Sequence, residues 1–303
     1  MLEKLELKSE HRCYQGWQRY YEHPSDTIGL PMRFSIYLPP QAQAFSAVQH
    51  PEDPRRYGQQ ACPVLFFLAG LTCTEETFMI KAAAQQFAAQ HGLILVTPDT
   101  SPRGANIDGE DDDWDFGSGA GFYLDATQPP WNQHYRMESY IVDELCPLIT
   151  AGFAQKTQQV GVFGHSMGGH GALVLAQRHL GLFKSVSAFA PIAAPTQCPW
   201  GKKAFTGYLG PDEEQWKQYD ASVLMATQKT APYPAGILVD QGLADPFLEN
   251  ELYPEVFEQA CAKVKQPLTL RRHEGYDHGY YFIMTFMRDH IEFHASQLLN
   301  TSL

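Results

Sequence analysis

Ser166 lies at the centre of Gly164-His165-Ser166-Met167-Gly168, which fits the pattern G-x-S-x-G. The pattern is short, so its surroundings decide its meaning. An apolar run at 160–163 leads directly into it, and a helical pattern over 168–179 leads out. A strand, a tight turn and a helix in that order expose a serine hydroxyl above a sheet. We therefore predict that Ser166 is a nucleophile rather than a plain turn residue or helix cap.

The glycines around this serine support the same interpretation. A turn this tight leaves no room for bulky neighbours, and Gly164, Gly168 and Gly169 carry no Cβ. The helix that follows directs its N-terminus at the serine, where its free N–H groups favour a developing negative charge.

A serine nucleophile needs two N–H donors for the oxygen that becomes anionic. One is expected from Met167, the residue after the nucleophile, and the other from the loop after an early central strand. That loop is 69–74, where Gly70 permits a sharp turn and the Leu71 N–H is the best candidate. The alternative is that this segment is only a loop.

The general base must be chosen among 12 histidines. In chain order the acid follows the serine and the histidine follows the acid. His278 fits, because it lies after the last apolar run and before a helical pattern, whereas His273, the main alternative, ends the run itself. The histidines beside the nucleophile are expected to shape the pocket, and those in the C-terminal helical pattern to be surface or packing residues: His165 and His170, and His290 and His294.

The acid that orients the histidine is expected after the preceding strand. Asp240 ends that strand, and Asp245 lies in the loop beyond it, after Gly242. Asp277 is a third possibility, but adjacent residues rarely face one another. We favour Asp245, whose role would be to hold the tautomer of His278 and to stabilise its imidazolium form.

Short apolar runs alternate with helical patterns along the chain, which predicts a mostly parallel central sheet flanked by helices on both faces. Together with the strand–serine–helix motif, this favours an α/β-hydrolase fold, with functional loops at the carboxyl ends of the strands. Strands are expected at 33–38, 63–69, 92–97, 160–163, 186–189, 236–239 and 268–270. Helices are expected at 77–90, 137–149, 168–179, 251–263 and 282–298.

The chain has 303 residues, 44% of them hydrophobic, which is ordinary for a globular protein. We expect one domain over 1–303, with a surface insertion around 41–62. Residues 101–130 are rich in glycine, proline and acids, and are either a functional loop or a solvated cover.

Composition excludes several classes of function. A net charge of −12 argues against nucleic acid and anionic membranes as partners, although a small anionic substrate remains compatible. No run approaches the length of a membrane span, and the N-terminus lacks the apolar core of a signal peptide. Six scattered cysteines without zinc-ligand spacing indicate free thiols and no metal. The glycine-rich segment 117–121 follows no clear strand, so no cofactor is expected.

Beyond these features, the chain resembles the S-formylglutathione hydrolase family, also called esterase D. The resemblance rests on five segments, which occur in the family's order and span nearly the whole chain. They are 68–75, 114–123, 164–172, 201–210 and 276–282. One departure is 41–62, which looks longer than is typical of the family.

The resemblance implies hydrolysis of S-formylglutathione, a small glutathione thioester, to formate and glutathione in formaldehyde detoxification. It implies Ser166, Asp245 and His278 as the catalytic triad and Leu71 and Met167 as oxyanion donors. It also implies a cytoplasmic homodimer that needs no metal or cofactor.

Two other functions remain open: a broad short-chain carboxylesterase with the same triad, and a non-catalytic binding protein that kept the fold. Cys73 lies two residues beyond the proposed oxyanion donor. It is either a redox-sensitive thiol near the site or a packing residue. Lys202 and Lys203 are either contacts for glutathione or solvated surface lysines.

Overall fold

Nine strands form one sheet in a computed structural model that describes residues 2–299. Their order across the sheet is β1-β2-β3-β5-β4-β6-β7-β8-β9. The strands are β1 (Glu6–Cys13), β2 (Gly16–Pro24), β3 (Pro31–Leu38), β4 (Val64–Leu68), β5 (Ile94–Pro98), β6 (Val160–His165), β7 (Ser185–Phe189), β8 (Ile237–Gly242) and β9 (Leu268–His273).

The sheet is mostly parallel, as predicted. Strands β5, β4, β6, β7, β8 and β9 pair in parallel, whereas β1, β2 and β3 form an antiparallel extension that joins β5 through β3. Every residue of β4 to β8 is buried, which explains their continuous apolar runs. Sequence analysis missed β1 and β2, because the edge strand β1 is polar and largely exposed.

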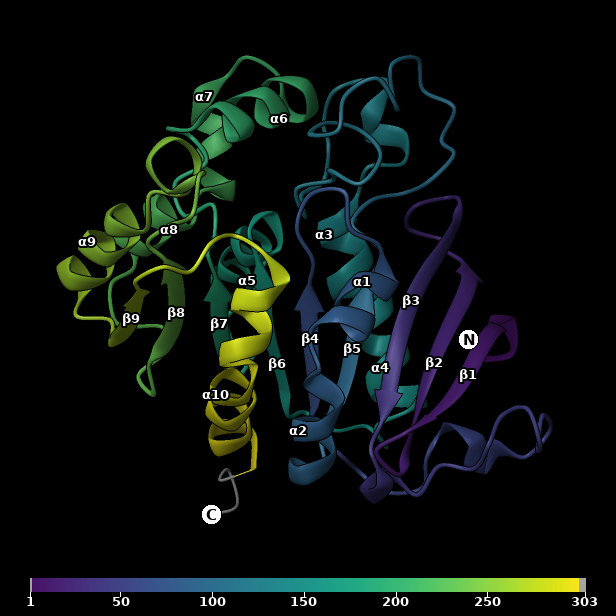
Figure 1. Ribbon diagram of the computed structural model, residues 1–303. Helices are drawn as coiled ribbons and strands as arrows, with labels where there is room; N and C mark the ends of the chain where they lie inside the picture. The colour runs from purple at the N-terminus through teal and green to yellow at the C-terminus, as the bar shows by residue number, and fades with distance from the viewer. Residues whose placement is uncertain (1, 300–303) are drawn as a thin grey trace.

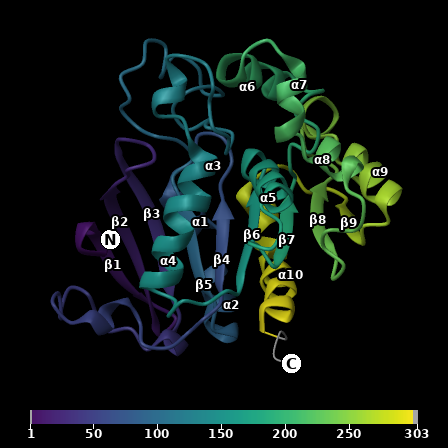
Figure 2. The same cartoon turned by 180° about the vertical axis from the view of Figure 1, so that it is seen from behind.

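Helices cover both faces of this sheet. Figure 1 shows α1, α2 and α10 on one face, and Figure 2 shows α3, α4 and α5 on the other. The α-helices are α1 (Glu75–Lys81), α2 (Ala84–His91), α3 (Met137–Ser139), α4 (Cys146–Gly152), α5 (Met167–Arg178), α6 (Pro199–Leu209), α7 (Glu213–Trp216), α8 (Ala221–Thr227), α9 (Pro254–Val264) and α10 (Tyr280–Leu299). The 3₁₀ helices are η1 (Leu2–Lys4), η2 (Pro40–Ala42), η3 (Pro54–Tyr57), η4 (Trp131–Gln133) and η6 (Lys217–Tyr219), and the π-helices are η5 (Tyr140–Leu145) and η7 (Leu248–Leu252).

One predicted helix is wrong in its extent. Residues 77–90 do not form a single helix, because the chain breaks between α1 and α2, where Ala83 takes a left-handed φ of 53°. Helix α1 packs on β3 and β5, whereas α2 packs on α10 and β5. One straight helix cannot reach both sets of neighbours, so tertiary packing overrides the alanine-rich propensity.

The segment between β3 and β4, which includes 41–62, is tied to the antiparallel strands by hydrogen bonds. Trp17 Nε1 donates to the Ala44 carbonyl at 3.0 Å, and Arg19 Nη2 donates to the Phe45 carbonyl at 2.5 Å. The description of 41–62 as an insertion within one domain stays a prediction. Within residues 2–299, no helix is both long and apolar enough to cross a bilayer.

The functional loops gather at one end of the sheet. In Figure 1 the arrow of β4 points toward the end of the molecule where α6, α7 and the long segment between β5 and α3 lie. The carboxyl ends of parallel strands meet at one edge, so side chains that follow β4, β6, β8 and β9 can converge there.

A buried chain of polar side chains joins β7 and β8 to α10. Asp240 Oδ2 lies 3.2 Å from His290 Nε2, and His290 Nδ1 and His294 Nε2 each lie 2.8 Å from Ser187 Oγ. His294 Nδ1 lies 2.6 Å from Ser185 Oγ. Both histidines are fully buried, and burial lowers the pKa of each imidazole, so both are neutral packing residues.

We expect Ser187→Ala to lower the free energy of unfolding by about 1–3 kcal/mol, because it leaves two buried imidazole nitrogens without a partner. Urea denaturation of the variant measures this change. The matched control is Ser296→Ala, which removes an exposed hydroxyl from α10, the helix that carries His290 and His294. Equal stability of the two variants would contradict a structural role for the buried chain.

Candidate active site

Ser166 occupies a strained turn between β6 and α5. Its φ of 58° and ψ of −120° lie in a region that residues with a side chain rarely adopt. The Ser166 N–H donates to the Phe189 carbonyl at 3.0 Å, and the Ser166 carbonyl accepts from the His170 N–H at 2.9 Å. These bonds to β7 and α5 hold the strained conformation in place.

The glycines beside Ser166 are required by the close approach of α5 to the sheet. A Cβ on Gly168 would collide with the Leu68 carbonyl at the end of β4, and a Cβ on Gly164 would collide with the Gly168 carbonyl. The turn therefore fits only because these positions have no side chain, as the sequence pattern indicated.

His278, which is partly buried, and Asp245, which is buried, form a hydrogen-bonded pair. His278 Nδ1 lies 2.5 Å from Asp245 Oδ2. The same carboxylate accepts hydrogen bonds from Gln241 Nε2 at 3.2 Å and from the Phe247 N–H at 2.9 Å. An Nδ1–H that donates to a carboxylate leaves Nε2 of His278 as the proton acceptor.

The rival acids and the rival base are engaged elsewhere. Asp240 accepts two hydrogen bonds from Arg271, both at 2.6 Å. Burial opposes ionisation of Asp240, but the hydrogen bonds from His290 and Arg271 outweigh it and hold the pKa of that carboxyl below its ordinary value. The ring of His273 stacks on that of Phe286, with centroids 3.8 Å apart, and His273 Nε2 lies 3.3 Å from Asp240 Oδ1.

Asp277, the third acid considered, accepts the N–H of Gly279 at 2.9 Å. It therefore serves the turn before α10, although it is adjacent to His278. Of the three candidate acids, Asp245 is the one that the structure places against the imidazole of His278.

Ser166 and His278 line the same small cavity, of about 150 Å³. Its wall is mainly aromatic, and its lining residues are Gly70, Leu71, Cys73, Trp114, His165, Ser166, Trp200, Phe247, His278 and Tyr280. The structure thus brings together Ser166, the predicted nucleophile after β6, and His278, which lies between β9 and α10. The His165 ring lies 4.4 Å from that of His278, and burial lowers the pKa of His165 well below its ordinary value.

Sequence reasoning missed most of this aromatic wall. Trp200 and Phe247 come from α6 and from the loop after β8, and their rings lie 4.7 Å apart. The ring of Phe247 lies 5.0 Å from that of His278, in an edge-to-face arrangement. Trp114 and Tyr280 lie within segments that carry the family resemblance, so the sequence did draw attention to them. Trp200 and Phe247 lie outside those segments, and nothing in the sequence pattern indicated that they line the cavity.

The two proposed oxyanion donors have free N–H groups. Within residues 2–299, the main-chain N–H groups of Leu71 and Met167 donate no hydrogen bond. Met167 begins α5, and Leu71 lines the cavity with Ser166. A Cβ on Gly70 would lie only 3.2 Å from Ser166 Cβ, so the loop passes directly beside the nucleophile.

Cys73 also lines the cavity, and burial raises the pKa of its thiol. A protonated thiol is a poor nucleophile, so its redox sensitivity stays a prediction. Lys203 is engaged in ion pairs with Asp113 at 2.9 Å and with Asp115. Lys203 is therefore neutralised by acids of this chain.

The fold and this cavity define a serine hydrolase of the α/β-hydrolase class. The esterase family model, described as "Putative esterase", matches residues 25–293. The S-formylglutathione hydrolase of Rattus norvegicus is 51% identical over 97% of this chain and 99% of its own length. That of Arabidopsis thaliana is 50% identical over 95% of each chain.

A solved S-formylglutathione hydrolase from Agrobacterium tumefaciens superposes with a TM-score of 0.88. It is 43% identical to this chain and covers 96% of it, with 99% of its own chain covered. The chain therefore belongs to the S-formylglutathione hydrolase family of esterases.

Proposed function

We infer that this protein hydrolyses S-formylglutathione to formate and glutathione through a covalent formyl-enzyme intermediate. The observation that carries this proposal is the hydrogen bond between His278 and Asp245 at the wall of the cavity that also exposes Ser166. Relatives of the same name, about half identical over nearly the whole chain, supply the identity of the substrate.

In the acylation step, Ser166 Oγ attacks the formyl carbon while His278 Nε2 takes the hydroxyl proton. The carbonyl oxygen becomes an oxyanion, which the N–H groups of Leu71 and Met167 stabilise. The C–S bond then breaks, and His278 returns the proton to the departing sulfur, so glutathione leaves as a thiol. Asp245 keeps the imidazole in the required tautomer throughout.

In the deacylation step, a water molecule attacks the formyl ester on Ser166 while His278 again accepts a proton. A second oxyanion forms in the same place, and its collapse returns the proton to Ser166 Oγ. Formic acid leaves and ionises to formate and a proton, and the resting enzyme is restored. Over both steps, the thioester and one water molecule are converted to the glutathione thiol and formic acid, and the enzyme is unchanged.

The small aromatic cavity fits a small acyl group such as formyl. One extra methylene costs only about 1–3 kcal/mol of discrimination, so some hydrolysis of acetyl esters is expected. A broad short-chain carboxylesterase is the second candidate, favoured by the apolar character of this wall.

The deciding experiment compares kcat/KM for S-formylglutathione with kcat/KM for 4-nitrophenyl acetate on the purified protein. We expect the thioester to be preferred by at least about 100-fold, since the glutathione portion adds binding energy in the transition state. Equal values would favour the carboxylesterase.

A histidine base works only as the neutral imidazole, so hydrolysis should be lost in acid. The protonated ring cannot accept the Ser166 proton, so kcat/KM should fall about tenfold per pH unit on the acid side. A pH profile with 4-nitrophenyl acetate measures this. A flat profile would argue against His278 as the base.

The homodimeric state and the cytoplasmic location implied by the family resemblance are also part of this proposal. The six unpaired cysteines, all within residues 2–299, are compatible with a reducing compartment. Light scattering coupled to gel filtration tests the assembly, and fractionation of the source cells tests the location.

A further inference from the structure

The loop that carries Leu71 is anchored through its carbonyl and N–H groups by residues outside the triad. The Ala69 carbonyl accepts from the Tyr123 hydroxyl at 2.8 Å, and the Thr72 N–H donates to the Gly119 carbonyl at 2.9 Å. Thr72 itself takes a φ of 67°. The chain therefore turns sharply around Leu71, and this turn needs support.

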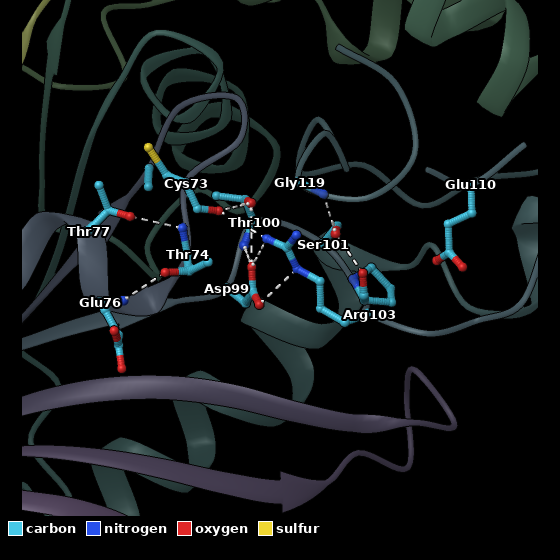
Figure 3. Close-up of polar contacts among 12 residues, drawn as sticks. Cys73, Thr74, Glu76, Thr77, Asp99, Thr100, Ser101, Arg103, Glu110 and Gly119 are labelled. Atoms are coloured by element: carbon cyan, nitrogen blue, oxygen red, sulfur yellow. Dashed lines mark hydrogen bonds and ion pairs between the residues drawn. The ribbon is translucent and has the colours of Figure 1, made fainter. Parts of the chain in front are cut away.

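The strongest of these anchors acts on the carbonyl of Cys73. Thr100 Oγ1 donates to it at 2.6 Å, and Arg103 Nη2 donates to it at 3.1 Å (Figure 3). The Cys73 N–H donates to the Gly70 carbonyl at 3.3 Å, and that carbonyl shares a planar peptide unit with the Leu71 N–H. The position of Cys73 therefore constrains the direction of the Leu71 N–H.

Arg103 is in turn held by Asp99, the residue that follows β5. Arg103 Nε donates to Asp99 Oδ2 at 3.1 Å, and Arg103 Nη2 donates to Asp99 Oδ1 at 2.8 Å, as Figure 3 shows. The Asp99 side chain is only 6% exposed, and its Oδ1 also accepts the Thr100 N–H at 2.7 Å. A buried carboxylate at the end of a central strand thus fixes the guanidinium rigidly.

Packing does not replace these bonds, because the side of the loop around Arg103 borders a cavity. This cavity, of about 510 Å³, is lined by Thr74, Glu75, Asp99, Ser101 and Arg103, among others. The loop thus lies between two cavities, one that holds Ser166 and one that holds the Asp99–Arg103 pair.

We propose that Asp99 and Arg103 are positioning residues for the oxyanion hole, which hold the Leu71 N–H toward the anionic oxygen by fixing the Cys73 carbonyl. This inference rests on the proposed use of Leu71 as an oxyanion donor. Among residues 2–299, Arg103 donates to Asp99 and to the Cys73 carbonyl and does not line the cavity that holds Ser166, so it acts through the main chain of the loop.

The test replaces Arg103 by Gln and by Lys and measures hydrolysis of 4-nitrophenyl acetate, with active sites counted by a fluorophosphonate. Misplacement of a catalytic group by about 1 Å costs on the order of 100-fold, so we expect Arg103→Gln to lower kcat by about 10- to 100-fold with KM within about twofold. Arg103→Lys should retain an intermediate rate, because it keeps the charge but loses the planar fork.

A second measurement separates positioning from a loss of folded enzyme. A trifluoromethyl ketone adds reversibly to the nucleophile and places an alkoxide in the oxyanion hole, so its inhibition constant should rise in proportion to the fall in kcat/KM. That constant does not depend on how many molecules are folded. An unchanged inhibition constant would overturn the proposal. So would a variant whose kcat is unchanged and whose KM is raised.

The matched control is Arg33→Gln. Arg33 lines the same 510 Å³ cavity and is paired with Glu22 at 2.8 Å, an ion pair on β2 and β3. The Arg33→Gln variant should leave kcat and the inhibition constant unchanged. A fall in kcat equal to that of Arg103→Gln would also overturn the proposal. Because every assay uses an aryl ester, failure of S-formylglutathione as a substrate would appear separately in the wild-type protein.

Discussion

Ser166→Ala is expected to lower kcat for S-formylglutathione by about 10⁶-fold, because the variant has no nucleophile and cannot form an acyl-enzyme. The fold should persist, since the strain at this position lies in the main chain and its main-chain hydrogen bonds do not involve the hydroxyl. Single-turnover kinetics on the purified variant measure the loss, and circular dichroism checks the fold.

The same variant should no longer react with a fluorophosphonate probe, which labels the activated serine of the wild-type protein. The matched control is Ser46→Ala, which removes a buried hydroxyl that donates to Glu10 on the edge strand β1 and leaves the turn around Ser166 unchanged. Labelling of Ser166→Ala at the wild-type rate would show that another residue is the nucleophile.

Asp245→Asn is expected to lower kcat by about 10⁴-fold with little change in fold. An asparagine amide can donate to Nδ1 of His278, which then carries its proton on Nε2 and cannot accept the one from Ser166. The amide still fills the site between Gln241 and Phe247. Steady-state kinetics with 4-nitrophenyl acetate measure the loss.

The control for this variant is Asp277→Asn, which makes the same chemical change in the residue next to His278. Asp277 bonds to the Gly279 N–H rather than to the imidazole, so its variant should stay within about threefold of wild type. If Asp277→Asn lowered kcat as much as Asp245→Asn, then negative charge near His278, and not the tautomer of its imidazole, would be what matters.

Some features of the site could be predicted because they are local. The position of Ser166 follows from an apolar run, three glycines and a helical pattern within 20 residues. The apolar run, the glycines and the helical pattern each favour the strand, the turn and the helix that this segment forms. The same holds for the buried parallel strands, whose composition reports their burial on both faces.

Other features depend on partners that lie far away in the chain. Asp240 lies in β8 and Asp245 in the loop after it, five residues further on. Only the pairing of β8 with β9 brings Arg271 against Asp240 and leaves Asp245 to His278. The break between α1 and α2 likewise arises because these helices pack on different neighbours. Neither the acid that pairs with His278 nor the break between α1 and α2 can be predicted from the residues next to it in the chain.

The sequence by itself therefore determined the class of fold, and it predicted Ser166 as the nucleophile and the chain order of the triad, because short-range sterics and periodicity encode the local motifs. The tertiary structure decided the partner of the histidine, the aromatic wall of Trp200 and Phe247, and the clamp of Asp99 and Arg103 on the Cys73 carbonyl. These contacts join segments from different strands and helices, and their energies depend on distances that exist only once the sheet has assembled.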